Sequence, residues 1–146
     1  MKLYLLNALI TPFEVEENEM AVFVVQKLSK EKFIEIFQLA VESKAEVISS
    51  IGHQSTAEFL KQILPDNLKK FVSHQRIGIS IEEGDLALIF RITERAEKIQ
   101  EWTLDDLQDF YSQGKIEFLT LSRVYMPEMV FNPANFFSEK EDRNEC

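Results

Sequence analysis

A tight turn followed by a helix is expected from the stretch Ser49-Ser50-Ile51-Gly52-His53-Gln54-Ser55-Thr56-Ala57-Glu58-Phe59-Leu60-Lys61-Gln62-Ile63-Leu64. Gly52 suits the turn because glycine adopts backbone angles that other residues resist. Ser55 or Thr56 can cap the first turn of the helix, and Pro65 ends it. The apolar residues of one buried face recur at helical spacing: Ala57, Leu60 and Leu64.

His53 is thereby held just before the N-terminus of this helix. Free backbone N–H groups and the positive end of the helix dipole attract phosphate at such a position. A histidine beside a phosphate site is a candidate general acid or base. A histidine next to a glycine in a turn is more often structural or merely exposed, so the local pattern leaves both interpretations open.

Length and composition indicate one globular domain. The chain has 146 residues, a common size for a single domain. Its only cysteine is Cys146, so neither an intrachain disulfide nor a cysteine-based metal site is expected. No apolar run is long enough to span a membrane, and we expect a cytoplasmic protein, in the host-cell cytoplasm if it is viral.

The charge of the chain restricts its partners. A net charge of −9 argues against binding to long nucleic acid, which requires an extended basic surface. It does not exclude a small anionic ligand, because the chain is locally basic between the acidic clusters at 82–85 and 101–109.

Strands and helices alternate along the chain, which is typical of the α/β class. Strands are expected at residues 2–8, 20–27, 47–51, 76–81, 86–92 and 115–124. Helices are expected after a Ser29 cap to about Ser43, from the Gly52 turn to Leu64, and after a Thr103 cap to Gly114. Residues 66–74 fit a short helical turn or a loop. The nearly all-apolar run 86–92 is expected at the centre of a mixed β-sheet flanked by helices.

The expected domain is single and compact and covers residues 1–125. Residues 126–146 form a C-terminal extension that is partly apolar, and its charged end, 139–146, is expected to be disordered. The apolar residues of the extension are expected to pack on the domain or on a second subunit: Met129, Val130, Phe131, Phe136 and Phe137.

Common catalytic motifs are absent from the sequence, including the phosphate-cradling glycine loops and the GxSxG elbow. His53 and His74 lack a metal-site spacing with carboxylates, so any enzymatic chemistry is expected to need no metal. Polar residues remain at the expected loop edges: Asn7, Thr11, His53, Ser55, Arg76, Arg91, Arg95 and Lys98. Taken singly, such an arginine is more often a solvated surface residue. Trp102 suits either base stacking or a hydrophobic staple at the Thr103 cap.

Several segments occur in the order known from one family. They are Tyr4-Leu5-Leu6-Asn7-Ala8, Ser50-Ile51-Gly52-His53-Gln54-Ser55-Thr56-Ala57, Arg76, Gly84-Asp85, Arg95-Ala96-Glu97 and Trp102-Thr103-Leu104-Asp105-Asp106-Leu107. Over roughly residues 2–124 the chain resembles the viral ring nucleases, known as type III anti-CRISPR proteins. The resemblance implies a compact α/β homodimer that binds cyclic tetra-adenylate across its two-fold axis. Such enzymes cleave this second messenger and shut off the CRISPR effectors that it activates.

The resemblance also implies roles for particular residues. The catalytic residues would be His53 and Arg95, and no cofactor is implied. The substrate-binding residues would be Asn7, Thr11, Ser55, Thr56, Arg76 and Lys98. In RNA-type cleavage the 2′-hydroxyl attacks the adjacent phosphorus, His53 protonates the departing 5′-oxygen, and the arginines stabilise the charge of the transition state.

Two positions depart from the family pattern. Ile10 replaces a small hydroxyl residue, with Thr11 beside it, and Lys98 replaces an acidic residue, with Glu97 beside it. The Lys98 departure keeps open a non-cleaving module that sequesters a cyclic oligonucleotide. A protein-interaction module in which His53 is structural also remains open.

Overall fold

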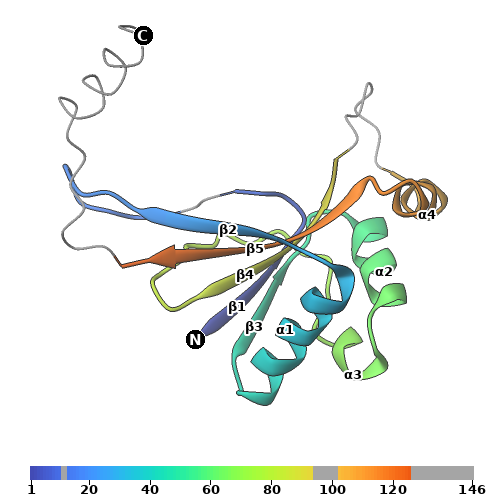
Figure 1. Cartoon of the computed structure of the whole chain (residues 1–146), viewed down its shortest axis with the longest axis horizontal. Coiled ribbons are helices and arrows are strands. Elements are labelled where there is room, and N and C mark those ends of the chain that lie inside the picture. Colours follow the sequence, from blue (N-terminus) through green and yellow to red (C-terminus); the bar gives the residue numbers. More distant parts are fainter. Residues whose placement is uncertain (11–12, 94–101, 126–146) are drawn as a thin grey trace, which may run out of the picture.

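One mixed β-sheet forms the centre of the computed structural model, which describes residues 1–10, 13–93 and 102–125 (Figure 1). In the part of the chain that the structure describes, the sheet has five strands in the order β2-β5-β4-β1-β3. The strands are β1 (Lys2–Leu6), β2 (Val22–Leu28), β3 (Glu46–Ser50), β4 (Leu86–Ile92) and β5 (Ile116–Val124). β1 pairs in parallel with β3 and β4, whereas β5 runs antiparallel to β4 and β2. The predicted α/β class and mixed sheet are therefore confirmed.

The helices cover one face of the sheet, as Figure 1 shows. They are α1 (Lys30–Glu42), α2 (Gln54–Ile63), α3 (Asp66–Lys69) and α4 (Leu104–Ser112). A single apolar cluster joins buried side chains of all these helices to alternate residues of the strands. None of the helices in the described ranges is long and apolar enough to cross a membrane.

β4 is buried on both faces, as predicted for residues 86–92. Leu88 and Phe90 belong to the cluster beneath the helices, whereas Ala87 and Ile89 belong to a second cluster on the opposite face. The two sets separate because successive side chains of a strand point to opposite faces. The Phe90 ring lies between aromatic neighbours, with its centroid 5.9 Å from that of Phe59 and 5.6 Å from that of Phe118.

The second face of the sheet is covered by an irregular segment, and the strand predicted at 76–81 is wrong. Ile79 and Ile81 of this segment pack on the second cluster, and the Tyr4 hydroxyl donates a hydrogen bond to the Ser80 carbonyl at 3.1 Å. The alternating apolar residues Ile79 and Ile81 do face the sheet. They belong to a segment that lies over the sheet, outside the strand ladder.

Local cap chemistry sets the ends of two helices where it was expected. The Ser29 hydroxyl accepts a hydrogen bond from the Lys32 N–H at 3.1 Å at the start of α1. Thr103 and Asp106 form a reciprocal capping box at the start of α4. Gly114 follows α4 with φ of 71°, a left-handed conformation that suits glycine.

Trp102 packs edge-on against Phe110 of α4, with a centroid distance of 4.8 Å. A hydrophobic staple would place the tryptophan against Leu107, the fourth residue after the Thr103 cap, and that contact stays a prediction. Residues 94–101 and the C-terminal extension 126–146 lie outside the described residues.

Phe90→Ala is expected to lower the free energy of unfolding by about 3–5 kcal/mol, because it removes a buried ring that Phe59 and Phe118 contact. Urea denaturation followed by circular dichroism measures the loss. Leu39→Ala, on the exposed side of α1, is the control and should change the same quantity by less than about 0.5 kcal/mol. Equal losses in both variants would contradict the central place of Phe90.

Candidate functional site

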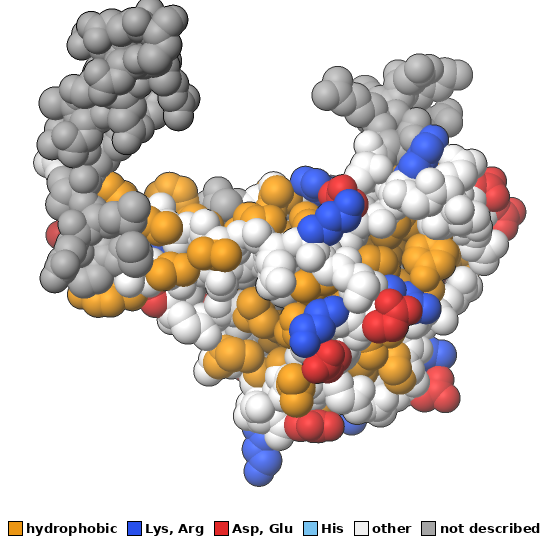
Figure 2. Space-filling view, viewed as in Figure 1, with side chains coloured by type: hydrophobic (Ala, Val, Ile, Leu, Met, Phe, Trp, Pro, Cys, Tyr) orange, Lys and Arg blue, Asp and Glu red, His pale blue; other side chains and the backbone are white. Residues whose placement is uncertain are grey.

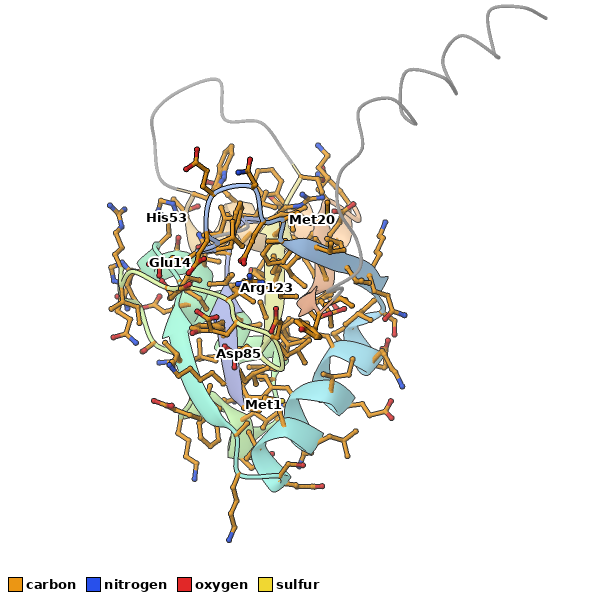
Figure 3. All side chains as sticks on the ribbon, turned by 90° about the vertical axis from the view of Figure 1, so that its left-hand side faces the viewer. Met1, Glu14, Met20, His53, Asp85 and Arg123 are labelled. Atoms are coloured by element: carbon orange, nitrogen blue, oxygen red, sulfur yellow. The ribbon has the colours of Figure 1, made fainter. Side chains whose placement is uncertain are left out.

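The candidate site lies at the carboxyl edge of the parallel strands. Leu6, the last residue of β1, pairs with Ser50 of β3 and with Ile89 of β4. Asn7 follows β1, and the Gly52 turn follows β3. In Figure 3 His53 lies at the opposite end of the strands from Met1 and Asp85, which mark the amino ends of β1 and β4. Ligands of open α/β sheets bind at this carboxyl edge.

Side chains from separate segments converge on the peptide groups of Gly52. The Gly52 N–H donates to Asn7 Oδ1 at 3.3 Å. The Gly52 carbonyl lies 3.2 Å from Arg76 Nε, which donates to it, and 3.2 Å from His74 Nε2. We name this arrangement, made by Asn7, Gly52, His74 and Arg76, the Gly52 clasp. It brings the predicted residues Asn7 and Arg76 together beside His53.

Gly52 has room for a methyl group, and the special backbone angle expected of this glycine is wrong. The described glycines with positive φ are Gly84 and Gly114. A Cβ added to Gly52 would lie 3.5 Å from Arg76 Nε and 4.0 Å from Asn7 Oδ1, which is ordinary van der Waals contact. A methyl group therefore fits the clasp, whereas a larger side chain would displace Arg76.

The N-terminus of α2 points toward the same place. His53 is the N-cap, with an extended backbone (φ −130°, ψ 132°), and its carbonyl accepts the Ala57 N–H at 3.1 Å. The first N–H groups of a helix have no intrahelical acceptor, and the helix dipole adds positive potential there. The first turn of α2 therefore presents backbone N–H donors next to His53.

The predicted capping role of Ser55 or Thr56 is wrong, because the helix starts one residue after His53 and no side chain caps it. Ser55 lies within the first turn, and its hydroxyl donates to the Trp102 carbonyl at 2.5 Å. This bond ties α2 to the residue before the Thr103 cap of α4. Thr56 is only 2% exposed, so its side chain faces the core. Contact of either residue with a substrate stays a prediction.

Comparison with known proteins defines the family. Residues 3–118 match the family described as STIV B116-like. The chain belongs to this family. The solved structure of B116 of Sulfolobus turreted icosahedral virus is similar, with a TM-score of 0.60 and 28% identity, over 84% of this chain and 99% of that one. An uncharacterized protein, ORF116 of Acidianus filamentous virus 1, is 32% identical over 72 residues. That match covers 49% of this chain and 59% of the viral relative.

The family match and the resemblance proposed from motifs cover nearly the same part of the chain. The STIV B116-like relatives establish the family and the fold, and the descriptions of these viral proteins name no activity.

Three predicted site residues lie outside the described residues. Thr11 belongs to 11–12, and Arg95 and Lys98 belong to 94–101. The second of these stretches follows β4, which is parallel to β1 and ends at the same edge of the sheet. The predicted roles of these three residues stay predictions.

His74 is the residue of the Gly52 clasp that no sequence motif indicated as a site residue. It stands two positions before Arg76, and the backbone there is extended beside the end of β3, where Gln75 N–H donates to the Ile51 carbonyl at 3.2 Å. Side chains two apart in an extended segment share one side. This spacing is the signal that could have placed His74 with Arg76.

Arg91 was expected at a loop edge, but it lies within β4, in an ion cluster on the face opposite the helices. Its Nη2 donates to Glu117 Oε2 at 2.6 Å, and Lys27 Nζ lies 3.5 Å from Glu117 Oε1. The hydrogen bond from Arg91, with the charges of Arg91 and Lys27, holds the pKa of Glu117 below its usual range despite partial burial. Arg91 Nε is buried without a hydrogen-bond partner.

Ser55→Ala is expected to lower the free energy of unfolding by about 0.5–1.5 kcal/mol, because the Trp102 carbonyl loses its hydrogen bond. Urea denaturation measures the change. Ser112→Ala removes an exposed hydroxyl bond within α4 and serves as the control, with a smaller effect. An unchanged stability of the Ser55 variant would show that this bond does not tie α2 to α4.

Glu117→Gln is expected to destabilise the protein at neutral pH and to have a shrinking effect as the pH falls. A carboxylate whose folded-state pKa is lowered contributes stability above its unfolded pKa, about 4.3 for glutamate, and loses it as the pH falls through the folded value. Urea denaturation of both proteins from pH 7 to pH 3 checks the trend. Glu35→Gln, in an exposed pair with Lys32, is the matched control and should show little difference at any pH.

Proposed function

We propose that this chain is a metal-independent ring nuclease that cleaves cyclic tetra-adenylate to linear di-adenylates and thereby switches off type III CRISPR signalling. The observation that carries the proposal is the Gly52 clasp, which gathers Asn7, Arg76 and His74 around the peptide that precedes His53. These residue types recognise phosphate and transfer protons, and they stand at the edge of the sheet where α/β domains bind ligands.

The Gly52 clasp orients Arg76 in a way that suits phosphate binding. Its Nε is bonded to the Gly52 carbonyl, which fixes the plane of the guanidinium group while its outer nitrogens remain able to bind an anion. The N–H groups of the first turn of α2 add donors that need no reorganisation. In the proposed reaction His53 gives a proton to the departing 5′-oxygen, and Arg95 helps to stabilise the negative charge of the transition state.

A homodimer completes the proposal. A symmetric cyclic ligand suits two identical sites, each with one His53 and one Arg76. Figure 2 shows hydrophobic side chains gathered over the end of the sheet away from the helices. Val24 and Val25 of β2 are 50% and 46% exposed, and within the described residues β2 pairs only with β5. An apolar edge strand of this kind favours contact with a second copy.

Two further parts of the proposal concern metal and location. In the described residues no cluster of His, Cys, Asp or Glu has a geometry that would hold a metal ion. The proposed cleavage uses His53 and arginines in its place. The protein would act in the cytoplasm, which is that of the host cell if the chain is viral.

His53→Ala is expected to lower the single-turnover rate by about 10² to 10⁴, the usual loss for a general acid, and to leave ligand affinity nearly unchanged. The fold should survive because His53 caps α2 through its backbone. The assay incubates excess protein with cyclic tetra-adenylate or cyclic hexa-adenylate in EDTA and separates the products by chromatography. Circular dichroism checks folding of the variant.

The same assay distinguishes the alternatives. Tight binding with intact ligand would replace the nuclease by a non-cleaving sponge, the reading that Lys98 in place of an acidic residue favours. No affinity for either ring would leave a protein-interaction module. Activity that is lost in EDTA and restored by magnesium or manganese would refute the metal-independent mechanism.

A further inference from the structure

His74 and His53 are the two histidines of the chain, and they flank one peptide group. His74 Nε2 lies 3.2 Å from the Gly52 carbonyl oxygen, and His53 is the next residue along the chain. By standard backbone dimensions that oxygen is about 3 Å from the His53 Cα. The His74 ring nitrogen therefore lies within roughly 6 Å of the His53 Cα, even though 22 positions separate His74 from Gly52 in the sequence.

The Gly52 carbonyl determines which His74 nitrogen carries hydrogen. A carbonyl oxygen only accepts hydrogen bonds, so Nε2 must be the protonated nitrogen of the neutral ring. Nδ1 of the same neutral ring then has a lone pair and accepts a proton. The side chain of His74 is exposed, so Nδ1 can reach a bound ligand.

The backbone around His74 is fixed by hydrogen bonds to β3 and its end. The Gln75 N–H donates to the Ile51 carbonyl, and the Gln75 side-chain amide donates to the Ser49 carbonyl at 2.6 Å. The Ser49 hydroxyl in turn donates to the Ser73 carbonyl at 2.7 Å. These bonds restrict the backbone of His74, and the Gly52 carbonyl restricts its ring. A restricted side chain loses little freedom when it transfers a proton.

We propose that His74 is the general base of the reaction, an inference that rests on the ring nuclease function proposed above. His74 Nδ1 takes the proton of a 2′-hydroxyl, and the 2′-oxygen forms a bond to the adjacent phosphorus. The bond from phosphorus to the 5′-oxygen breaks, and the proton of the His53 imidazolium goes to that leaving oxygen. The products are a 2′,3′-cyclic phosphate and a free 5′-hydroxyl, with the protons balanced between the two histidines.

The charged groups around His74 fit this role. Arg76 shares the Gly52 carbonyl with His74 and holds the phosphate in the proposed complex. In the sequence just before His74, Lys69 is paired with Asp66 at 2.9 Å, and Lys70 lies over the Phe71 ring at 5.2 Å. His53, the proposed acid, is the residue that follows the shared Gly52 carbonyl in the chain.

The test is the dependence of the single-turnover rate on pH, measured in EDTA with cyclic tetra-adenylate. A neutral base and a protonated acid produce a bell-shaped profile. In His74→Gln the amide N–H still donates to the Gly52 carbonyl, but no group accepts the proton. We expect this variant to lose about 10² to 10⁴ in rate and to lose the rising limb of the profile, with affinity unchanged.

Two comparisons sharpen the test. His74→Ala should regain rate when free imidazole is added, because the small base enters the space that the ring leaves. Lys70→Gln changes an exposed neighbouring residue and should keep the wild-type rate and both limbs of the profile. His53→Gln should lose the falling limb, the opposite change from His74→Gln.

The outcomes separate this inference from the proposed function. A wild-type protein that does not cleave the ring overturns both. A wild-type protein that cleaves, with a His74→Gln variant that keeps the rate and both limbs, overturns the role of His74 alone. A variant that loses affinity and rate in parallel while keeping both limbs would make His74 a binding residue and would also overturn the proposal.

Discussion

Parallel pairing of β1 with β3 and β4 is the constraint on which the rest of the structure depends. Parallel neighbours cannot be joined by a hairpin, so the chain must leave each strand at the same edge and return through a crossover. The crossover from β3 to β4 starts at Gly52 and contains α2 and α3. The Gly52 turn, which precedes α2, therefore lies beside Asn7, which follows β1. The candidate site is a consequence of this connectivity.

Charge is distributed in a way that an overall composition does not reveal. Away from the site, basic side chains are neutralised by carboxylates, as Arg91 is by Glu117 and Arg123 is by Glu82 and Glu83 at 3.7 and 3.9 Å. At the clasp, Arg76 is oriented by a backbone carbonyl, which fixes a cation without cancelling its charge. An acidic chain can in this way present a local anion site.

The parts of the fold that sequence patterns predicted are those with local causes. The Ser29 and Thr103 caps and the buried run of β4 depend on neighbours within a few residues, and the structure has all of them. The strand expected at 76–81 was wrong because an alternating apolar pattern fits a covering segment equally well. His74 was missed because its contact with Gly52 spans 22 positions and leaves no local pattern.

The irregular segment from His74 to Ile81, which follows α3 and covers the second face of the sheet, affects the local opening of the domain. The segment is attached to the second face of the sheet by the packing of Ile79 and Ile81 and by a few side-chain hydrogen bonds. It lacks the continuous ladder of backbone hydrogen bonds that joins a strand to a sheet. Segments held in this way open at a lower free energy than the global unfolding of a domain. Since the same segment begins with His74 and Arg76, each opening would dismantle the clasp. An anion that bridges Arg76 and α2 would keep it closed, so occupancy of the site and slow hydrogen exchange of residues 75–81 would be two readings of one equilibrium.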